Sequence, residues 1–239
     1  MNKRCIILIA QCVLLCGPGW LAAQQSPHPA FSSDAQAERI PNLDTLKKEL
    51  RQYHDCTCTC GCWMHDQDAE ANRALGFLRR RAAHRRPQEK LAMILDIDET
   101  TLSNYQEEIG ADFAYNPAVF NAWVETAQAT AIPSTLRLYQ EAQRLDVKII
   151  FITGRSETQH GATERNLRAQ GFDNWQELMM RPVDHGTQSI GDFKKAIRSQ
   201  MIAKGYVLAL NVGDQWSDLK GKPEAEYSVK YPDPYYFIP

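Results

Sequence analysis

The strongest constraint on the fold is an apolar run that ends in two aspartates. Residues 91–104 read LAMILDIDETTLSN. Five consecutive apolar residues predict a strand buried on both faces, as in a parallel sheet. Because side chains alternate along a strand, Asp96 and Asp98 are expected on the same side, just beyond its carboxyl end. Ligands of open α/β sheets bind at that edge, where one carboxylate can attack phosphorus and hold a divalent cation while its neighbour moves the proton.

Strand and helix patterns alternate along the rest of the chain. The other expected strands are 147–152, 178–180 and 206–212. The expected helices are 43–53, 66–85, one opened by Pro133, 158–170 and 190–204. This alternation predicts an α/β fold, a three-layer Rossmann-like parallel sheet with helices on both faces. Residues 103–132 form an aromatic-rich insertion, which we expect to be a small helical cap.

The first residues are typical of an export signal. A short basic start precedes an apolar stretch at residues 5–16, followed by a Gly-Pro-Gly break and small residues. This pattern predicts a secretory signal peptide at 1–23, because the apolar stretch is too short to anchor the chain in a bilayer. Lipid attachment at Cys16 is the less favoured alternative. Residues 24–40 are expected to form a flexible leader and residues 41–239 one domain in the periplasm or outside the cell.

The cysteines that remain after the signal peptide all lie in one loop, CTCTCGC at residues 56–62: Cys56, Cys58, Cys60 and Cys62. An exported protein can form disulfides, and pairs spaced along this loop could close small rings. A zinc or copper site with the flanking His54 and His65 is the alternative. Structural zinc sites usually draw on two separated ligand pairs, so a disulfide-rich surface loop or an insertion without catalytic consequence is preferred.

Acidic side chains follow two of the expected strands. Asp96 and Asp98 follow the first, and Asp214, with Asp218 a turn later, follows the last. If the strands are parallel neighbours, these carboxylates meet at one edge and repel one another, by about 4 kcal/mol per close pair at an effective dielectric constant of 20. A dication removes this repulsion, and hard oxygen ligands beside a phosphate suit Mg²⁺.

A phosphate group also needs donors and positive charge. Thr153 and Gly154 end another strand and offer a hydroxyl and a close backbone approach. Lys194 and Lys195 begin the helix before the last strand, about 100° apart around its axis, so only one of them can face the site. Each of these residues alone could be an ordinary helix cap, but the joint pattern favours a phosphate site.

These motifs resemble a known family. DIDET at 96–100, TGR at 153–155, Lys194 and GDQWSD at 213–218 match, in order, the four motifs of haloacid dehalogenase-like (HAD) phosphatases. Their wording resembles the class B acid phosphatase group, which includes plant vegetative storage proteins and bacterial exported acid phosphatases. The similarity runs from about residue 42 to 239, except at the CTCTCGC loop. The family's lysine stands four residues before an arginine, which favours Lys194, since Arg198 follows it.

The resemblance implies a role for each matching residue. Asp96 would attack phosphorus and form an aspartyl-phosphate, while Asp98 would protonate the leaving alcohol and then activate water. Thr153, Gly154 and Lys194 would hold the phosphoryl group. Mg²⁺ would be bound by Asp96, the backbone carbonyl of Asp98 and Asp214. Asp218 would support these ligands without binding the metal directly.

The sequence therefore predicts an exported, Mg²⁺-dependent acid phosphatase acting on small phosphomonoesters. Nucleotides are candidate substrates if Tyr105, Phe120, Trp123 or Trp216 stacks on a base, although packing between cap and core is the preferred reading of these aromatics. A non-catalytic storage or binding protein that retains the fold is the alternative. A formal net charge of −2 and one short basic cluster do not indicate a nucleic-acid polymer as partner. No transmembrane anchor is expected, and an oligomer is compatible with the sequence.

Overall fold

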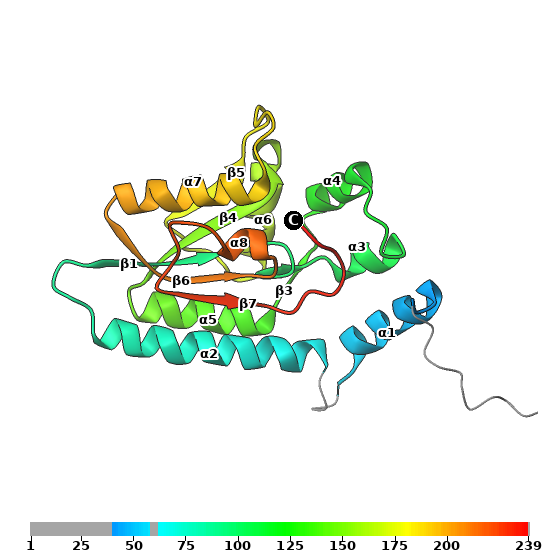
Figure 1. Ribbon diagram of the computed structural model, residues 1–239, viewed down its shortest axis with the longest axis horizontal. Coiled ribbons are helices and arrows are strands. Elements are labelled where there is room, and N and C mark those ends of the chain that lie inside the picture. Colours follow the sequence, from blue (N-terminus) through cyan, green and yellow to red (C-terminus); the bar gives the residue numbers. More distant parts are fainter. Residues whose placement is uncertain (1–39, 58–61, 239) are drawn as a thin grey trace, which may run out of the picture. The chain divides into compact units, whose positions relative to one another are not determined.

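The computed structural model describes residues 40–57 and 62–238. The chain divides after Pro41, and the compact unit Asn42–Pro239 carries every helix and strand described below (Figure 1). The expected signal peptide and nearly all of the expected leader lie outside the described residues, as do residues 58–61 of the cysteine-rich loop. Within the described ranges, no helix is both long enough and apolar enough to cross a membrane.

A five-stranded parallel sheet with strand order β5-β4-β1-β6-β7 lies at the centre of this unit. Its strands are β1 (Lys90–Leu95), β4 (Lys148–Ser156), β5 (Glu177–Arg181), β6 (Tyr206–Gly213) and β7 (Tyr227–Lys230). The chain adds strands on one side of β1 and then on the other, so the order reverses there. Ligands bind at the carboxyl edge of such a switch point. The predicted α/β fold is confirmed.

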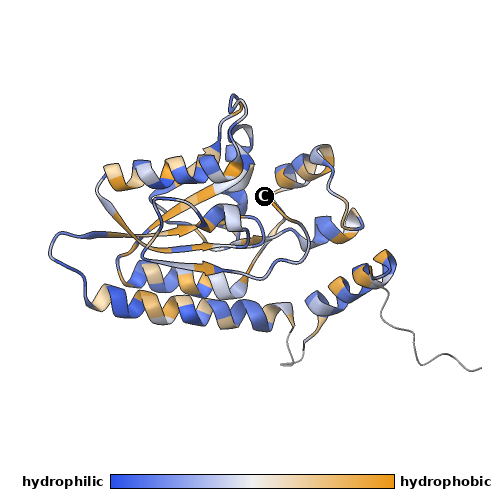
Figure 2. Cartoon of the chain, viewed as in Figure 1, coloured by the Kyte–Doolittle hydropathy of each residue, from blue (hydrophilic) through white to orange (hydrophobic). Residues whose placement is uncertain are grey.

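The burial of β1 explains why the apolar run is continuous. Leu91, Met93 and Leu95 belong to the larger core, whereas Ala92 and Ile94 belong to the smaller one. The larger core contains residues of α2 (Trp63–Ala83) and α5 (Pro133–Arg144), and the smaller one residues of α7 (Ile190–Ala203). These helices cover opposite faces of the sheet (Figure 1), and apolar colour is concentrated on the strands between them (Figure 2). By parity, Asp96 continues the side of Ala92 and Ile94, which faces α7.

The predicted helices are present with small shifts at their ends. The remaining helices are α1 (Leu43–Asp55), α3 (Tyr105–Gly110), α4 (Pro117–Thr126), a 3-10 turn (Glu157–Gln159), α6 (His160–Ala169) and α8 (Trp216–Leu219). Helix α2 begins at Trp63 rather than Asp66, and the helix expected at 158–170 begins as the 3-10 turn. Gly171 and Gly205 end α6 and α7 with φ values of +90° and +88°, which glycine adopts without strain.

The aromatic-rich insertion is joined to the core by both of its ends. Strand β2 (Leu102–Ser103) pairs antiparallel with β3 (Thr130–Ala131), and α3 and α4 lie between them. The sequence predicted a helical insertion here but not this two-stranded base, because strands of two residues carry no readable periodicity.

The cysteine-rich loop is closed by a disulfide between Cys56 and Cys62, with Cα atoms 5.6 Å apart. This bond joins the end of α1 to the beginning of α2 and forms a small ring of the kind expected from the sequence. It also uses two of the four sulfur atoms on which a zinc or copper site would depend. Cys58 and Cys60 lie outside the described residues.

Candidate active site

The carboxyl edge of the sheet brings three aspartates together. Asp96 follows β1, Asp214 follows β6 and Asp218 lies in α8. All three side chains are buried, and carboxylate oxygens from each lie within 4.8 Å of one another. The Asp96 backbone N–H donates to the Val212 carbonyl at 3.0 Å, so the pairing of β1 with β6 continues to the first of these residues. The sheet therefore brings Asp96 and Asp214 together, and the short helix α8 adds Asp218.

Lys194 is the lysine that faces this cluster. It lies on α7, is 4% exposed, and its Nζ donates to Asp96 Oδ1 and, at 2.6 Å, to Asp218 Oδ1. Burial alone would lower the pKa of Lys194, but the carboxylates of Asp218 and Asp96 outweigh burial, so the pKa is raised. Lys195 instead pairs with Asp192 on the exposed side of the helix. The two lysines diverge as helical spacing requires.

The three carboxylates carry more negative charge than one lysine can balance. Burial raises the pKa of Asp96 well above its usual range, against the attraction of Lys194, and the charges of Asp218 and Asp214 raise it further. Burial, and then the charge of Asp218, also raise the pKa of Asp214 well above its usual range. Buried oxygen ligands with surplus negative charge are the donor set that a hard divalent cation prefers. The cluster therefore fits a divalent cation.

Neutral donors hold Asp214 and Asp218 in place. Thr100 Oγ1 and Gln215 Nε2 donate to the two oxygens of Asp214 at 2.9 and 2.7 Å. The Gln215 backbone N–H donates to Asp218 Oδ2 at 2.8 Å. Gly213 leaves room for this arrangement, because a Cβ at that position would lie 2.7 Å from Asp218 Cγ. The glycine of the last motif is thus required by packing.

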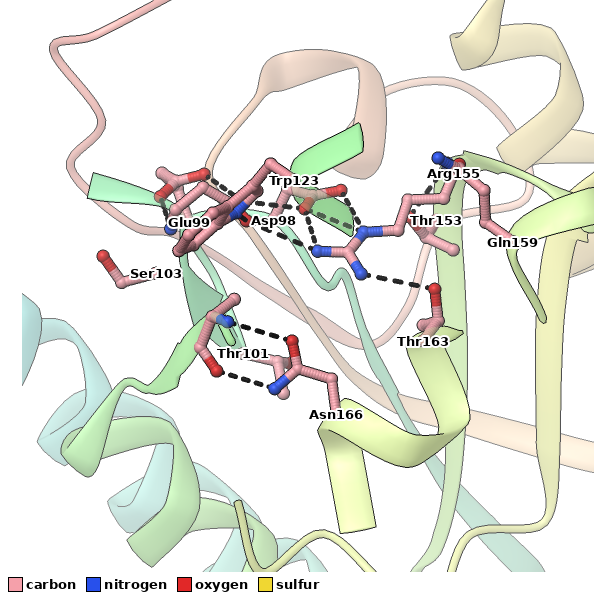
Figure 3. Close-up of polar contacts among 12 residues, drawn as sticks. Asp98, Glu99, Thr101, Ser103, Trp123, Thr153, Arg155, Gln159, Thr163 and Asn166 are labelled. Carbon is pink, nitrogen blue, oxygen red and sulfur yellow. Dashed lines mark hydrogen bonds and ion pairs between the residues drawn. The ribbon is translucent and has the colours of Figure 1, made fainter. Parts of the chain in front are cut away.

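Asp98 has a different set of partners. Its Oδ1 accepts from Arg155 Nη2 at 2.7 Å and from Arg155 Nε at 3.0 Å, and Arg155 Nη1 donates to Thr163 Oγ1 at 3.2 Å (Figure 3). Arg155 is 3% exposed. Arg155 belongs to the TGR motif at residues 153–155, but no role was predicted for it. Its position at the end of a buried strand was the available signal, because an arginine there needs a paired carboxylate.

The two other expected phosphate ligands differ in their positions. Gly154 lines the cavity described below, and a Cβ there would lie 3.3 Å from Ile190 Cδ1, closer than ordinary van der Waals contact. Thr153 is fully buried, and its Oγ1 accepts from the Arg155 backbone N–H at 3.1 Å. Thr153 does not line the cavity.

A cavity of about 530 Å³ opens over these residues. Asp96, Asp98, Lys194, Asp214 and Asp218 all line it. Further walls come from the insertion, from the segment after β5 and from the end of the described chain; they include Tyr115, Phe120, Val183, Tyr236, Phe237 and Ile238. A charged floor beneath largely apolar walls suits a substrate with an anionic head and an apolar body.

One of the four aromatic candidates, Phe120, lines this cavity. Trp216 is 46% exposed in a neighbouring hollow, with Lys220 Nζ 4.5 Å from its ring centroid. Tyr105 is buried. Trp123 is half-buried, and its Nε1 donates to Asn104 Oδ1 at 2.9 Å. Tyr105 and Trp123 therefore pack between the cap and the core, which was the preferred interpretation of these aromatics from the sequence.

Comparison with protein families matches residues 22–239 to the HAD superfamily, subfamily IIIB (acid phosphatase). The chain belongs to this family. The match confirms the resemblance that the four motifs indicated. It also agrees with the predicted enzyme class, because subfamily IIIB is described as an acid phosphatase family.

Relatives of this subfamily IIIB chain include acid phosphatase 1 of Solanum lycopersicum, 38% identical over 61% of this chain and 58% of that protein. The stem 28 kDa glycoprotein of Glycine max is 36% identical over 62% of this chain and 61% of that protein. Vegetative storage protein 1 of Arabidopsis thaliana is 28% identical over 85% of this chain and 76% of that protein. The chain thus spans less than two thirds of the first two relatives.

A solved structure shares the fold of this subfamily IIIB chain. It is the class C acid phosphatase from Bacillus anthracis with tungstate bound, which superposes with a TM-score of 0.67 at 19% sequence identity, over 80% of this chain and 85% of that one. This likeness confirms the parallel sheet with flanking helices.

Proposed function

We propose that this chain is a phosphomonoesterase, an acid phosphatase that hydrolyses small phosphate monoesters through a covalent aspartyl-phosphate. The main support is that Asp96, Lys194 and Asp98 meet at one cavity. They supply a nucleophile and an acid–base group from the segment after β1, and a fixed positive charge from α7.

In the proposed reaction, an Asp96 oxygen forms a bond to phosphorus while the bond from phosphorus to the ester oxygen breaks. The electron pair of that bond goes to the alcohol oxygen, which receives a proton from Asp98. Asp98 then takes a proton from water, whose oxygen attacks the aspartyl-phosphate and releases phosphate and free Asp96. Lys194 and Gly154, which line the cavity, are proposed to hold the phosphoryl group. Thr153 was expected to join them, but it is fully buried and does not line the cavity, so no direct contact with the phosphoryl group is assigned to it.

We assign the metal site to Asp96, the backbone carbonyl of Asp98 and Asp214, with Asp218 supporting them. The surplus of buried negative charge supports a divalent cation, and Mg²⁺ is the proposed one. When bound, it would neutralise charge on the phosphoryl oxygens. Asp218 also lies close enough to serve as a direct ligand, because one of its oxygens is within 4.8 Å of oxygens of Asp96 and Asp214.

Export is part of the proposal. The disulfide between Cys56 and Cys62 supports an oxidising compartment, because disulfides persist in periplasmic and secreted proteins. Together with the signal-peptide pattern at residues 1–23, this favours the periplasm or the exterior of the cell.

The walls of the cavity support a leaving group with an apolar or aromatic body. Phe120 and Tyr115 lie in the insertion, with ring centroids 6.1 Å apart, and both line the cavity. Nucleotides are therefore among the proposed substrates, with the base against these rings.

The alternative is a storage or binding protein that keeps the fold, in line with the names of two relatives. The presence of Asp96, Asp98, Lys194 and Asp214 weighs against it, because storage requires none of them.

The deciding experiment measures phosphate release from 4-nitrophenyl phosphate by the protein from residue 24 onward. It compares Mg²⁺ with EDTA, and wild type with Asp96→Asn and the surface control Asp192→Asn. We expect activity that requires the metal, is lost in Asp96→Asn and persists in the control. An Asp96→Asn variant as active as wild type contradicts the mechanism, and a folded wild type inactive on a panel of esters favours the storage alternative.

A further inference from the structure

Asn104 lies at the centre of a polar network between the catalytic edge and the insertion. It is fully buried, between β2 and α3. Its Nδ2 donates to Asp98 Oδ1 at 2.8 Å and to Glu99 Oε2 at 2.9 Å, and its backbone N–H donates to Glu99 Oε1 at 2.6 Å. Its Oδ1 accepts from Trp123 Nε1 at 2.9 Å. The labelled side chains of Asp98, Glu99 and Trp123 converge in Figure 3.

These partners fix the orientation of the Asn104 amide. A carboxylate paired with a guanidinium accepts hydrogen bonds, as Asp98 does from Arg155, and an indole N–H only donates them. A flipped amide would turn its oxygen toward Asp98 and its NH₂ group toward two donors, the Trp123 N–H and Arg155 Nη2, so the hydrogen bonds of Asn104 with these three side chains would be lost. Trp123 therefore helps to keep Asn104 in the orientation that donates to Asp98.

The same contacts make the two oxygens of Asp98 unequal. Oδ1 accepts from Arg155 Nη2 at 2.7 Å, from Arg155 Nε at 3.0 Å and from Asn104 Nδ2 at 2.8 Å. Among the described residues, Oδ2 is contacted through Arg155 Nε at 3.2 Å. An oxygen that meets three N–H donors is a poor site for a proton. Oδ2 is thus the oxygen left to pass a proton to a substrate in the cavity, which Asp98 lines.

We propose that Asn104 and Trp123 are positioning residues that aim the proton-transferring oxygen of Asp98 at the leaving group. Trp123 lies on α4, so a helix of the insertion contributes to catalysis without touching substrate. This inference rests on the proposed phosphomonoesterase function, because it concerns a step of that reaction.

The leaving group determines how much this positioning matters. When an alkyl phosphate is cleaved, the electron pair of the broken bond stays on an alkoxide oxygen, which needs the proton from Asp98. 4-Nitrophenolate is a stable anion and leaves without much help from an acid. A misaligned Asp98 must therefore slow alkyl esters more than 4-nitrophenyl phosphate.

The test compares kcat/KM for ethyl phosphate and 4-nitrophenyl phosphate in wild type, Trp123→Phe and Trp175→Phe. The first variant keeps an aromatic ring and removes the N–H. The second makes the same change in a core tryptophan that packs against Phe151, with ring centroids 5.8 Å apart, and does not line the cavity. For Trp123→Phe we expect kcat/KM to fall about 3- to 10-fold with ethyl phosphate, as for one lost hydrogen bond, and by less than about 2-fold with 4-nitrophenyl phosphate. The ratio should stay unchanged in Trp175→Phe.

Equal falls in kcat/KM for both esters in Trp123→Phe would assign Trp123 a packing role and overturn the inference. Unchanged kcat/KM values for both esters would overturn it as well. A wild type that hydrolyses neither ester would overturn the proposed function and this inference with it. If Trp123→Phe does not fold, 3-benzothienylalanine at position 123 replaces the N–H by sulfur at nearly constant shape, and the same ratio decides the question.

Discussion

Replacing Lys194 by methionine tests the charge balance of the site directly. Methionine has a similar length and no charge, so the variant keeps most of the packing and leaves Asp96 and Asp218 without their shared cation. The side chains of all three residues are at most 8% exposed, so water cannot replace that cation well.

The cost follows from this burial. Removing one partner of a buried ion pair typically costs about 3–5 kcal/mol. For a domain of this size, that corresponds to a fall in Tm of roughly 6–20 °C. The neighbouring Lys195→Met is a matched control, because Lys195 and Asp192 are 38% and 55% exposed and exposed pairs contribute little to stability.

The assay is thermal melting followed by circular dichroism in EDTA, together with phosphatase activity in Mg²⁺. We expect Lys194→Met to melt well below Lys195→Met and to lose activity by about 100-fold or more, because a fixed charge on the phosphoryl group is gone. If both variants melt at the same temperature in EDTA, or if Lys194→Met keeps wild-type activity, the charge balance described for the site is wrong.

Three further predictions concern the same edge of the sheet. The pKa values of Asp96 and Asp214 are raised in the folded protein, so the folded state binds protons more tightly than the unfolded chain. The metal-free protein should therefore gain stability as the pH falls from 8 to 5. Thermal melting in EDTA across this pH range measures this gain, and a Tm that falls with the pH would contradict the prediction. Arg155→Lys replaces a forked, two-nitrogen contact by a point charge, so kcat/KM should fall more for alkyl than for 4-nitrophenyl esters, whereas equal values for wild type and variant would show that the fork is not needed. Gly213→Ala puts a methyl group 2.7 Å from Asp218 Cγ and should cost about 1–3 kcal/mol in urea unfolding, and a variant as stable as wild type would refute the close packing.

The sequence predicted the parts of the site that depend on strand geometry. The parity of β1 puts Asp96 on the face of the sheet that α7 covers, and helical spacing separates Lys194 from Lys195. Both are local regularities, so they can be read from spacing. A small disulfide ring in the cysteine-rich loop was one of the possibilities that the sequence left open, since pairs spaced along the loop are close in the chain.

The partners of Asp98 could not be predicted in this way. Arg155 is 57 residues from Asp98, and Trp123 is 19 residues from Asn104. Such contacts depend on how the insertion folds back on the sheet, which no periodicity encodes. Strand β7 was also missed, because its four residues alternate too briefly to distinguish a strand from a loop.

The two-stranded base of the insertion makes this region an exchangeable cassette. Because Leu102 pairs with Ala131 and Ser103 with Thr130, the chain leaves the core and returns to it at neighbouring points. A donor loop with ends at the same spacing could be spliced there without moving the catalytic floor. A graft that carries an indole or another N–H donor where Trp123 stands would keep that hydrogen bond to Asn104, so such grafts should retain more activity on alkyl phosphates than grafts without the donor.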